Sequence, residues 1–238
     1  MCRDWWLHRL LFDIRMGTMK ISAVIFDLDG VIVSTDEYHY QAWKQISDQE
    51  NIYFDRAINE RLRGVSRMES LDIILSHSDK VYSESEKYLL AQRKNDIYCE
   101  LLNKLSANDI LPGIINLLIS LKARDIKIAI GSSSKNTPFI LDQIGLATNF
   151  DAIADGNSIK NSMPDSEVFL LAAEFLGVQP EECVVIEDAQ AGIDAAKAAG
   201  MKAVGIGSAA KCFNADMKLN DISNLDIDHL LEVNEIRS

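Results

Sequence analysis

The most informative segment of the chain is residues 24–31, which read Val24-Ile25-Phe26-Asp27-Leu28-Asp29-Gly30-Val31. The apolar run predicts a buried β-strand, and the glycine after it predicts a turn. Side chains at positions i and i+2 of a strand point to the same side, so Asp27 and Asp29 should emerge together where the strand ends. The segment therefore predicts a functional carboxylate pair, although a buried strand closed by an ordinary Asp/Gly turn has the same residues.

Two neighbouring carboxylates indicate a bound cation. Like charges this close raise each other's cost of ionising unless a cation lies between them. Mg²⁺ prefers hard oxygen ligands and often accompanies phosphate groups. In such a site, one carboxylate can attack phosphorus while its neighbour transfers protons. We therefore expect Mg²⁺ and phosphoryl chemistry at Asp27 and Asp29.

Composition limits the class of protein. The chain has 238 residues, 47% of them hydrophobic, which suits one large α/β domain or a core domain with a smaller one. A formal net charge of −12 argues against a surface that binds nucleic acid or an anionic membrane. The cysteines are Cys2, Cys99, Cys183 and Cys212. They lack CxxC and metal-ligand spacing, so we expect reduced thiols in a cytoplasm and no zinc site.

Residues 1–18 are expected to lie outside the fold. They carry apolar side chains at helical spacing, but His8, Arg9 and Asp13 interrupt any run long enough for a signal peptide or a membrane span. Met16 and Met19 are both possible starts, so the simplest interpretation is an upstream extension. A short amphipathic helix that contacts a partner or a membrane surface is the alternative.

Strands and helices are expected to alternate along most of the chain. Buried strands are predicted at 21–26, 126–130, 183–186 and 203–206. Helices are predicted at 113–124, 137–145, 165–176 and 189–199. This alternation predicts an α/β fold whose parallel sheet carries helices on both faces.

The segment 37–107 differs from the rest of the chain. It is rich in Glu, Lys, Gln and Leu, contains no strand-like run, and carries helical patterns at about 37–50, 69–77 and 84–105. We therefore expect an inserted helical domain at 35–109. The α/β core should comprise 19–34 and 110–238.

Two more strand ends carry polar side chains. The segment Gly131-Ser132-Ser133-Ser134-Lys135-Asn136 leads into a helix and suits a bound phosphate, although a plain helix cap would read the same. Glu187 and Asp188 follow another strand and can complete a metal site with Asp27, although an acidic pair is more often a solvated turn. Ligands of open α/β sheets bind at the carboxyl ends of the strands, so we expect these segments to form one site.

Taken together, these motifs resemble those of the haloacid dehalogenase-like phosphotransferases. The resemblance covers about residues 20–235, and its most specific segments are FDLDGVIVSTDEYHYQAW (26–43), LRGVSRMESL (62–71), GSSSKN (131–136) and IEDAQAGIDA (186–195). It implies a Rossmann-like core with a helical cap inserted at 35–109. It also implies a Mg²⁺-dependent enzyme.

The resemblance implies a role for individual residues. Asp27 matches the nucleophile that becomes an aspartyl phosphate, and Asp29 matches the acid/base. Asp27, the backbone carbonyl of Asp29 and Asp188 match the Mg²⁺ ligands, with Glu187 beside them. The implied substrate- and phosphate-binding residues are Thr35, His39, Trp43, Arg63, Gly64, Arg67, Ser132, Ser133, Lys135 and Asn136.

Several of these residues have a second interpretation. Thr35 and His39 match residues near the hinge that are tied to cap closure, although a lone histidine on a helix is more often packed or solvated. Arg67 matches a cation for the remote phosphate, but a surface charge at a helix start is the alternative. Trp43 also suits the core of the cap, and Arg63 stands where the family often has lysine.

One position departs from the family pattern. Where the family has a lysine before proline, this chain has Met163, in the segment Ser162-Met163-Pro164-Asp165-Ser166-Glu167-Val168-Phe169. A thioether carries no charge and donates no hydrogen bond. Lys160, three residues earlier, is close enough in sequence to reach back. We expect reduced turnover with Mg²⁺ and sugar phosphate still bound, unless Lys160 compensates.

Within the family, the chain is most similar to the sugar-phosphate mutases. This similarity implies an isomerase of carbohydrate metabolism that interconverts β-glucose 1-phosphate and glucose 6-phosphate through a 1,6-bisphosphate and phosphorylated Asp27. A cap-containing sugar-phosphate phosphatase is one alternative, and a catalytically weakened phosphosugar-binding protein with Met163 is another. We expect a cytoplasmic monomer whose partner is a small sugar phosphate, without nucleic acid or membrane.

Overall fold

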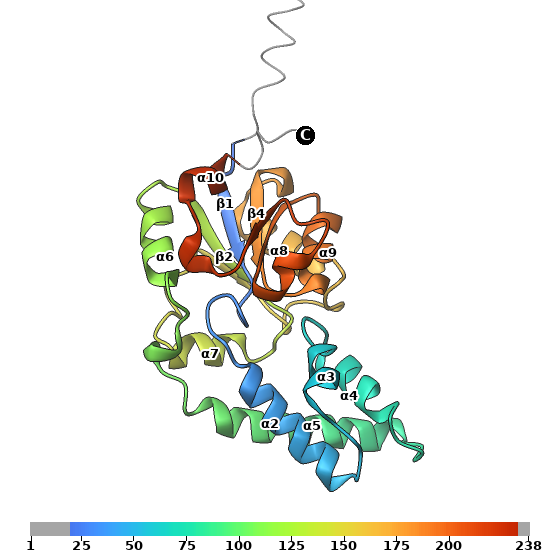
Figure 1. Ribbon diagram of the computed structural model, residues 1–238. Coiled ribbons are helices and arrows are strands. Elements are labelled where there is room, and N and C mark those ends of the chain that lie inside the picture. Colours follow the sequence, from blue (N-terminus) through green and yellow to red (C-terminus); the bar gives the residue numbers. More distant parts are fainter. Residues whose placement is uncertain (1–19, 233–238) are drawn as a thin grey trace, which may run out of the picture.

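A parallel sheet of six strands forms the centre of the larger domain (Figure 1). The structure is a computed structural model that describes residues 20–232, so the predicted extension at 1–18 lies outside the described residues. The strands are β1 (Ala23–Phe26), β2 (Lys127–Gly131), β3 (Ala152–Ala154), β4 (Cys183–Glu187), β5 (Lys202–Ile206) and β6 (Met217–Leu219). Their spatial order is β3-β2-β1-β4-β5-β6, and every neighbouring pair is parallel. The predicted α/β fold class is confirmed.

Helices cover both faces of this sheet. Alternate residues of β1 point to opposite faces, so that Val24 and Phe26 belong to one apolar cluster while Ala23 and Ile25 belong to another. The first cluster also contains side chains from α6 (Ile114–Lys122), α7 (Thr137–Gln143) and α10 (Ile227–Leu231). The second contains side chains from α8 (Glu167–Leu176) and α9 (Gln190–Ala198). Covering both faces explains why the central strands read as continuous apolar runs.

Two strands and two helices were missing from the sequence-based prediction. The strands are β3 and β6, three residues each, which lie at the two edges of the sheet and pair on one side only. The helices are α3 (Arg56–Glu60) and α10, which have five residues each. Segments this short show neither helical nor strand periodicity, which explains why a pattern search overlooks them.

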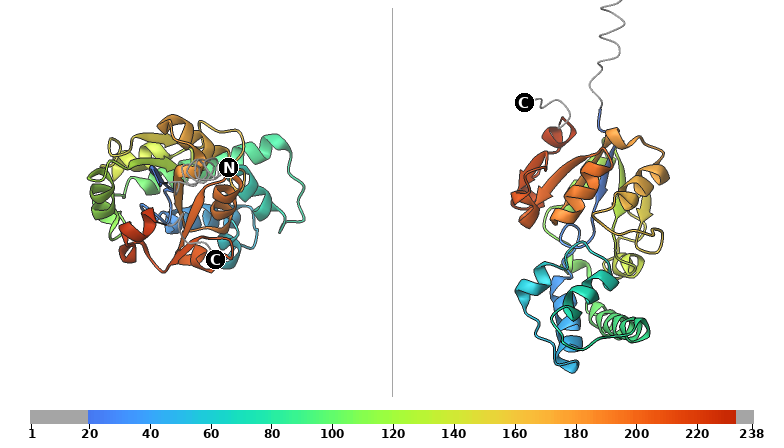
Figure 2. Two further views of the ribbon diagram at one scale, coloured as in Figure 1. Left: turned by 90° about the horizontal axis from the view of Figure 1, so that it is seen from above. Right: turned by 90° about the vertical axis from the view of Figure 1, so that its right-hand side faces the viewer.

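The inserted helices form a second body beyond one end of the sheet's strands, as both Figure 1 and the right-hand view of Figure 2 show. They are α2 (Asp36–Gln49), α3, α4 (Arg67–Leu75) and α5 (Glu84–Leu102). Trp43, Leu71 and Ile74 lie in an apolar cluster of their own. We call this body the cap, residues 35–109, and the rest of the described chain the core.

Helix α5 connects the two apolar interiors. Leu90 and Ala91 belong to the apolar cluster of the cap, whereas Tyr98 and Leu102 belong to the cluster on one face of the sheet. The cap is therefore joined to the core by shared packing as well as by its two chain connections.

Four short 3₁₀ helices complete the secondary structure of residues 20–232. They are η1 (Ala107–Asp109), η2 (Pro180–Glu182), η3 (Gly207–Lys211) and η4 (Ile222–Asn224). Across the same residues, no helix is both long enough and apolar enough to span a membrane.

The shared packing of α5 can be tested by truncating Leu102, which is 0% exposed. We expect Leu102→Ala to lower the free energy of unfolding by about 2–5 kcal/mol, because a buried cavity replaces the side chain. Leu89→Ala is the matched control on the same helix, since Leu89 is 60% exposed, and it should change stability by less than about 0.5 kcal/mol. Urea denaturation measures both values, and equal losses would contradict the assignment of Leu102 to the core.

Candidate active site

A pocket of about 910 Å³ lies between the core and the cap. Its lining includes residues that follow β1, β2, β3 and β4 as well as residues of α2, α4 and α5. The strand ends therefore meet the cap at one place. Of the predicted site residues, those that line the pocket are Asp27, Asp29, His39, Trp43, Arg63, Gly64, Arg67, Ser132, Ser133, Lys135, Asn136, Glu187 and Asp188.

The backbone after β1 is held tightly against β4. The N–H of Asp27 donates to the carbonyl of Ile186 at 3.0 Å, so Asp27 continues the sheet pairing beyond the strand. Gly30 then turns the chain with φ of +82°, and a Cβ at this position would lie 2.1 Å from Oδ2 of Asp188. Only glycine combines this backbone angle with this close approach. The turn therefore brings the end of β1 against the end of β4.

Three buried carboxylates form a candidate metal centre. Asp27, Glu187 and Asp188 each offer a carboxylate oxygen, and these oxygens lie within 4.8 Å of one another. Oε1 of Glu187 accepts hydrogen bonds from the N–H groups of Asp188 and Ala189, both at 2.9 Å. Oε2 of Glu187 is buried and has no hydrogen-bond partner among the described residues. A cation is the natural partner for an unpaired buried carboxylate oxygen.

Burial and mutual repulsion shape the titration of this centre. Burial, followed by the nearby Asp188, raises the pKa of Asp27 well above its ordinary value. Burial, followed by Asp27, does the same for the pKa of Glu187. Gly192 is required for this packing, because a Cβ there would lie 1.9 Å from Oε2 of Glu187. Without a cation, ionisation of these carboxyl groups is therefore unfavourable. Their oxygen ligands are of the kind that Mg²⁺ prefers.

The carboxylate of Asp29 is held apart from these three groups. Its Oδ1 accepts the N–H of Thr35 at 2.6 Å, and its Oδ2 accepts the Thr35 hydroxyl. Burial and then Asp36 raise the pKa of Asp29 to about 6, although the hydrogen bonds from Thr35 lower it. A carboxyl group with a pKa near neutrality suits proton transfer. Metal binding by the backbone carbonyl of Asp29 stays a prediction.

Thr35 is the predicted site residue that does not line the pocket. It is fully buried and is not among the residues that line the pocket. Its hydroxyl lies 2.8 Å from the hydroxyl of Tyr98 in addition to bonding Asp29. The structure therefore gives Thr35 contacts that orient Asp29 next to the predicted hinge, and substrate binding by Thr35 stays a prediction.

Arg63 reaches from the cap to the carboxylates of the core. It lies in the loop before α4, and its Nη1 is 2.5 Å from Oδ2 of Asp188. Its Nη2 donates to Asp36, which also lines the pocket and was not predicted. Burial raises the pKa of Asp188 to about 7, while Arg63 acts in the opposite direction. Arg63 thus supplies positive charge to an acidic centre across the domain boundary.

The loop after β2 supplies hydroxyl groups. Ser132 is 3% exposed, and its hydrogen bond to Asp27 lowers the pKa of that carboxyl. The hydroxyl of Ser133 accepts the N–H of Met163 at 3.3 Å. Lys135 and Asn136 line the pocket just before α7 begins. These residues therefore face the pocket from the core side.

Lys94 is the most informative residue that sequence reasoning missed. It is 2% exposed, lines the pocket, and places its ammonium group 2.8 Å from Nδ1 of His39. The same group lies 5.0 Å from the ring centre of Trp43 and 4.3 Å from that of Tyr98. Within residues 20–232, no carboxylate lies within 4.0 Å of it. Burial, followed by Arg67, lowers the pKa of Lys94 well below its ordinary value.

A sequence signal for Lys94 does exist. It lies four residues after Leu90 and four before Tyr98, which are both buried on one side of α5. A charge at this spacing lies on the apolar side of the helix. In a segment rich in Lys and Glu, however, a lysine at this spacing resembles the solvent-exposed charges around it.

His39 connects Lys94 to Asp29. When Lys94 is protonated it can only donate, so Nδ1 of His39 accepts and Nε2 carries the imidazole proton. Nε2 lies 3.7 Å from Oδ2 of Asp29. Burial, followed by Lys94 and Arg67, lowers the pKa of His39 well below its ordinary value. The imidazole is therefore neutral, and its contact with Asp29 is not an ion pair.

Met163 places an apolar side chain in the pocket wall. It is 1% exposed and packs in the cluster formed by α8 and α9 against the sheet. Lys160 lines the same pocket but is exposed, and its N–H donates to Oε1 of Glu167 at 3.0 Å. Compensation for Met163 by Lys160 stays a prediction. The prediction that Trp43 lies in the core of the cap is confirmed, and Trp43 also lines the pocket.

Comparisons with known proteins agree on one family. Residues 21–200 match the family model described as haloacid dehalogenase-like hydrolase. The chain is 47% identical over 214 residues to a β-phosphoglucomutase of Bacillus subtilis, covering 89% of this chain and 95% of that protein. It is 31% identical over 187 residues to a phosphorylated carbohydrates phosphatase of Thermotoga maritima, covering 77% and 84%. A crystal structure of β-phosphoglucomutase from Clostridium difficile aligns with a TM-score of 0.86 and 44% identity, covering 90% and 97%.

The buried charge of Lys94 should reduce stability when no ligand is bound. We expect Lys94→Met to raise the free energy of unfolding by about 1 kcal/mol or more near pH 7, because a buried ammonium without a carboxylate partner is costly. This gain in stability should become smaller as the pH rises above the lowered pKa of Lys94 in the folded protein. It should vanish near pH 10.5, the ordinary pKa of lysine, because Lys94 then loses its proton in the unfolded chain as well. Urea denaturation across this pH range measures the effect.

Lys87→Met is the matched control for this prediction. Lys87 lies on the same helix, and its ammonium group is 2.9 Å from a carboxylate oxygen of Asp72. Removing this charge should not stabilise the protein. If Lys94→Met lowered the free energy of unfolding as much as Lys87→Met does, the assignment of Lys94 as a destabilising buried cation would be contradicted.

Proposed function

Because this chain belongs to the haloacid dehalogenase-like hydrolase family, we propose that it is a β-phosphoglucomutase that interconverts β-glucose 1-phosphate and glucose 6-phosphate. Its similarity to two proteins of that name extends over about nine-tenths of the chain. The observation that carries the proposal is the buried Lys94 on the cap wall of the pocket that contains Asp27 and Asp29. A pocket with carboxylates on one wall and cations on the other suits an anionic substrate.

We propose that Asp27 is the nucleophile and Asp29 the acid/base. An oxygen of Asp27 forms a bond to phosphorus while the bond from phosphorus to the sugar oxygen breaks, and Asp29 gives its proton to that oxygen. In the reverse direction a sugar hydroxyl attacks the aspartyl phosphate, and Asp29 takes its proton. The raised pKa of Asp29, about 6, supports both duties near neutral pH. A 1,6-bisphosphate links the two half-reactions.

We propose Mg²⁺ as the cofactor. Asp27, Asp188 and the backbone carbonyl of Asp29 would hold it, with Glu187 alongside. The buried carboxylate group and the unpaired Oε2 of Glu187 support this choice. When bound, the ion would neutralise negative charge on the phosphoryl oxygens.

The proposed phosphate and sugar contacts come from both domains. On the core side they are Ser132, Ser133, Lys135 and Asn136; on the cap side they are His39, Trp43, Arg63, Gly64, Arg67 and Lys94. A phosphoryl group in transfer spreads charge over its equatorial oxygens, so surrounding cations and donors lower the barrier by electrostatics. A closed cap also excludes water, which lets the aspartyl phosphate react with sugar.

Two other functions are supported by specific observations. The similarity to a phosphatase of Thermotoga maritima favours a sugar-phosphate phosphatase, which passes the phosphoryl group to water. Met163 favours a catalytically weakened phosphosugar-binding protein, since the pocket wall has an apolar side chain where the family has a lysine. Isomer formation and phosphate release distinguish these alternatives from the mutase.

We further propose a cytoplasmic monomer that acts on a small sugar phosphate and binds no nucleic acid or membrane. The formal net charge of −12 argues against binding to an anionic partner such as a nucleic acid or a membrane surface. Cys99, Cys183 and Cys212 are free thiols, which suits a reducing compartment.

The mutase proposal is tested by ³¹P NMR. Incubated with Mg²⁺ and β-glucose 1-phosphate and seeded with the 1,6-bisphosphate, the protein should produce glucose 6-phosphate with little inorganic phosphate. Asp27→Asn should form no isomer, because the amide cannot become an acyl phosphate in this cycle. Removal of Mg²⁺ with a chelator should stop the reaction. Inorganic phosphate as the main product would favour the phosphatase.

Restoring the family's lysine tests the role of Met163. We expect Met163→Lys to raise kcat about tenfold or more, because it returns a charge-assisted donor to the transferring group. Met163→Leu keeps an apolar side chain and should leave kcat near that of the original protein. Steady-state kinetics with thermal melts separates activity from folding. Equal kcat for Met163→Lys and the original chain would show that another residue, such as Lys160, supplies the charge.

A further inference from the structure

One hydrogen bond between cap and core involves two residues to which no role in the reaction has been given. The hydroxyl of Ser162, in the loop between β3 and α8, donates to Oε2 of Glu69 on α4 at 2.8 Å. Both residues lie at the wall of the pocket. The contact therefore closes one side of the pocket across the domain boundary.

On the cap side, this bond reaches the first turn of α4. Oε2 of Glu69 also accepts the N–H of Ser66 at 2.9 Å, and the N–H of Glu69 donates to the Ser66 hydroxyl at 3.3 Å, which is a complete capping box. The helix begins at Arg67, which lines the pocket. Burial raises the pKa of Glu69, but the bonds from Ser66 and Ser162 outweigh this and leave it below its ordinary value. Glu69 is therefore a charged acceptor fixed next to Arg67.

On the core side, the donor is equally well fixed. The carboxylate of Glu167 accepts the N–H groups of Lys160 at 3.0 Å and Asn161 at 2.8 Å. The carbonyl of Ser162 accepts the N–H of Asp165 at 3.1 Å. The N–H of Met163 donates to Ser133 at 3.3 Å. The Ser162 hydroxyl is thus presented from a loop attached to both α8 and the loop after β2.

We propose that Glu69 and Ser162 are positioning residues whose hydrogen bond favours the closed cap and so directs the phosphoryl group to sugar in preference to water. This inference rests on the proposed mutase function. Neither residue touches the reacting atoms in the proposed mechanism. Their bond adds to the free-energy difference between closed and open arrangements, and only the open one admits water freely to Asp27.

The other polar contacts across this boundary are less suitable for such a test. Asn136 contacts Asn95 at 3.0 Å and Cys99 at 3.7 Å, Arg63 pairs with Asp188 at 2.5 Å, and both Thr35 and His39 contact Asp29. Each of these contacts includes a residue that we assign to phosphate or metal binding. The bond from Ser162 to Glu69 can be removed without changing any of those residues.

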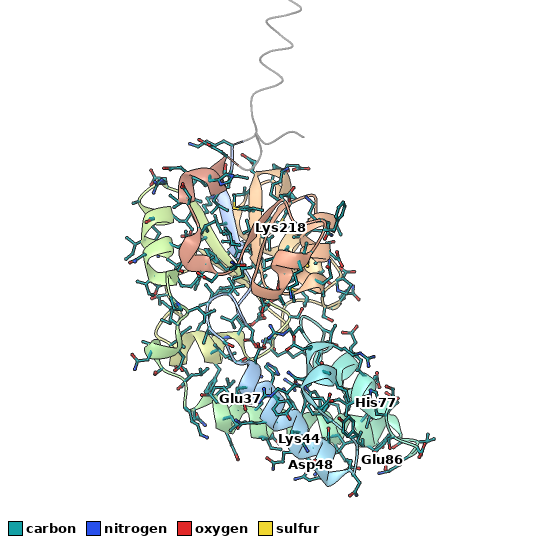
Figure 3. The ribbon with its side chains drawn as sticks, in the orientation of Figure 1. Glu37, Lys44, Asp48, His77, Glu86 and Lys218 are labelled. Atoms are coloured by element: carbon teal, nitrogen blue, oxygen red, sulfur yellow. The ribbon has the colours of Figure 1, made fainter. Side chains whose placement is uncertain are left out.

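The chain offers a matched control for Glu69. Helix α5 begins with the same capping box, in which Glu86 Oε2 accepts the N–H of Ser83 at 2.8 Å and the N–H of Glu86 donates to the Ser83 hydroxyl at 3.3 Å. Figure 3 shows Glu86 at the end of the cap away from the core. Glu69→Ala and Glu86→Ala therefore remove equivalent caps, but only Glu69→Ala removes the contact with the core.

The test measures inorganic phosphate released per isomer formed, with Mg²⁺, β-glucose 1-phosphate and the 1,6-bisphosphate present. We expect Ser162→Ala and Glu69→Ala each to raise this ratio about threefold to tenfold, the effect of one hydrogen bond. The double variant should not exceed the larger single effect by more than about twofold, because both remove the same bond. Ser162→Thr keeps a hydroxyl and should restore the original ratio. Glu86→Ala should lower the melting temperature as Glu69→Ala does, without changing the ratio.

An unchanged ratio in Ser162→Ala, or an equal rise in Glu86→Ala, would overturn the inference. A second readout does not depend on the mutase reaction. Small-angle X-ray scattering should give Ser162→Ala a larger radius of gyration than the original protein and the Glu86→Ala control, and equal radii would also overturn the inference. If the original protein forms no isomer but Ser162→Ala still expands, the proposed function fails while the role of the contact in closure stands.

Discussion

Electrostatic repulsion among three buried carboxylates is the constraint on which the rest of the site depends. Asp27, Glu187 and Asp188 offer oxygens within 4.8 Å of one another, in a place that excludes most water. Such a group is tolerated only where the backbone is rigid and positive charge is close. The parallel pairing of β1 with β4 provides the rigidity, and Arg63 from the cap provides part of the charge. The proposed divalent cation would account for the remaining unpaired oxygen of Glu187.

The cap supplies what the core lacks. Lys94 is nearly inaccessible to solvent and has no carboxylate oxygen within 4.0 Å among residues 20–232, so its charge is unfavourable in the unliganded protein. An anionic substrate would relieve this cost, and the same binding would favour closure of the cap. His39 links the cap to Asp29, the proposed acid/base, because it contacts both Lys94 and Asp29. In the proposed function, the stability lost by burying Lys94 would serve ligand recognition, as is common at functional sites.

Met163 departs from the family pattern in a way that changes the charge of this site, whereas Arg63 in place of lysine keeps the charge. The side chain of Met163 is buried and packs well with α8 and α9, so it does not harm the fold. The consequence lies in the charge of the pocket wall, which loses a cation next to Ser133. Affinity and rate need not change together, since in the proposed function the cations of the cap would still hold the substrate while the transferring group would lack one donor.

The sequence by itself determined the α/β class, the four central strands and the positions of Asp27, Asp29 and Glu187–Asp188, because continuous apolar runs and the residues that end them are local signals. Only the tertiary structure decided the edge strands β3 and β6, since their stability comes from neighbours and not from three-residue patterns. It also decided that Thr35 lies behind Asp29, that Lys94 is buried, and that Ser162 meets Glu69. These contacts join segments as many as 93 residues apart, and no local pattern encodes which side chains will meet across a domain boundary.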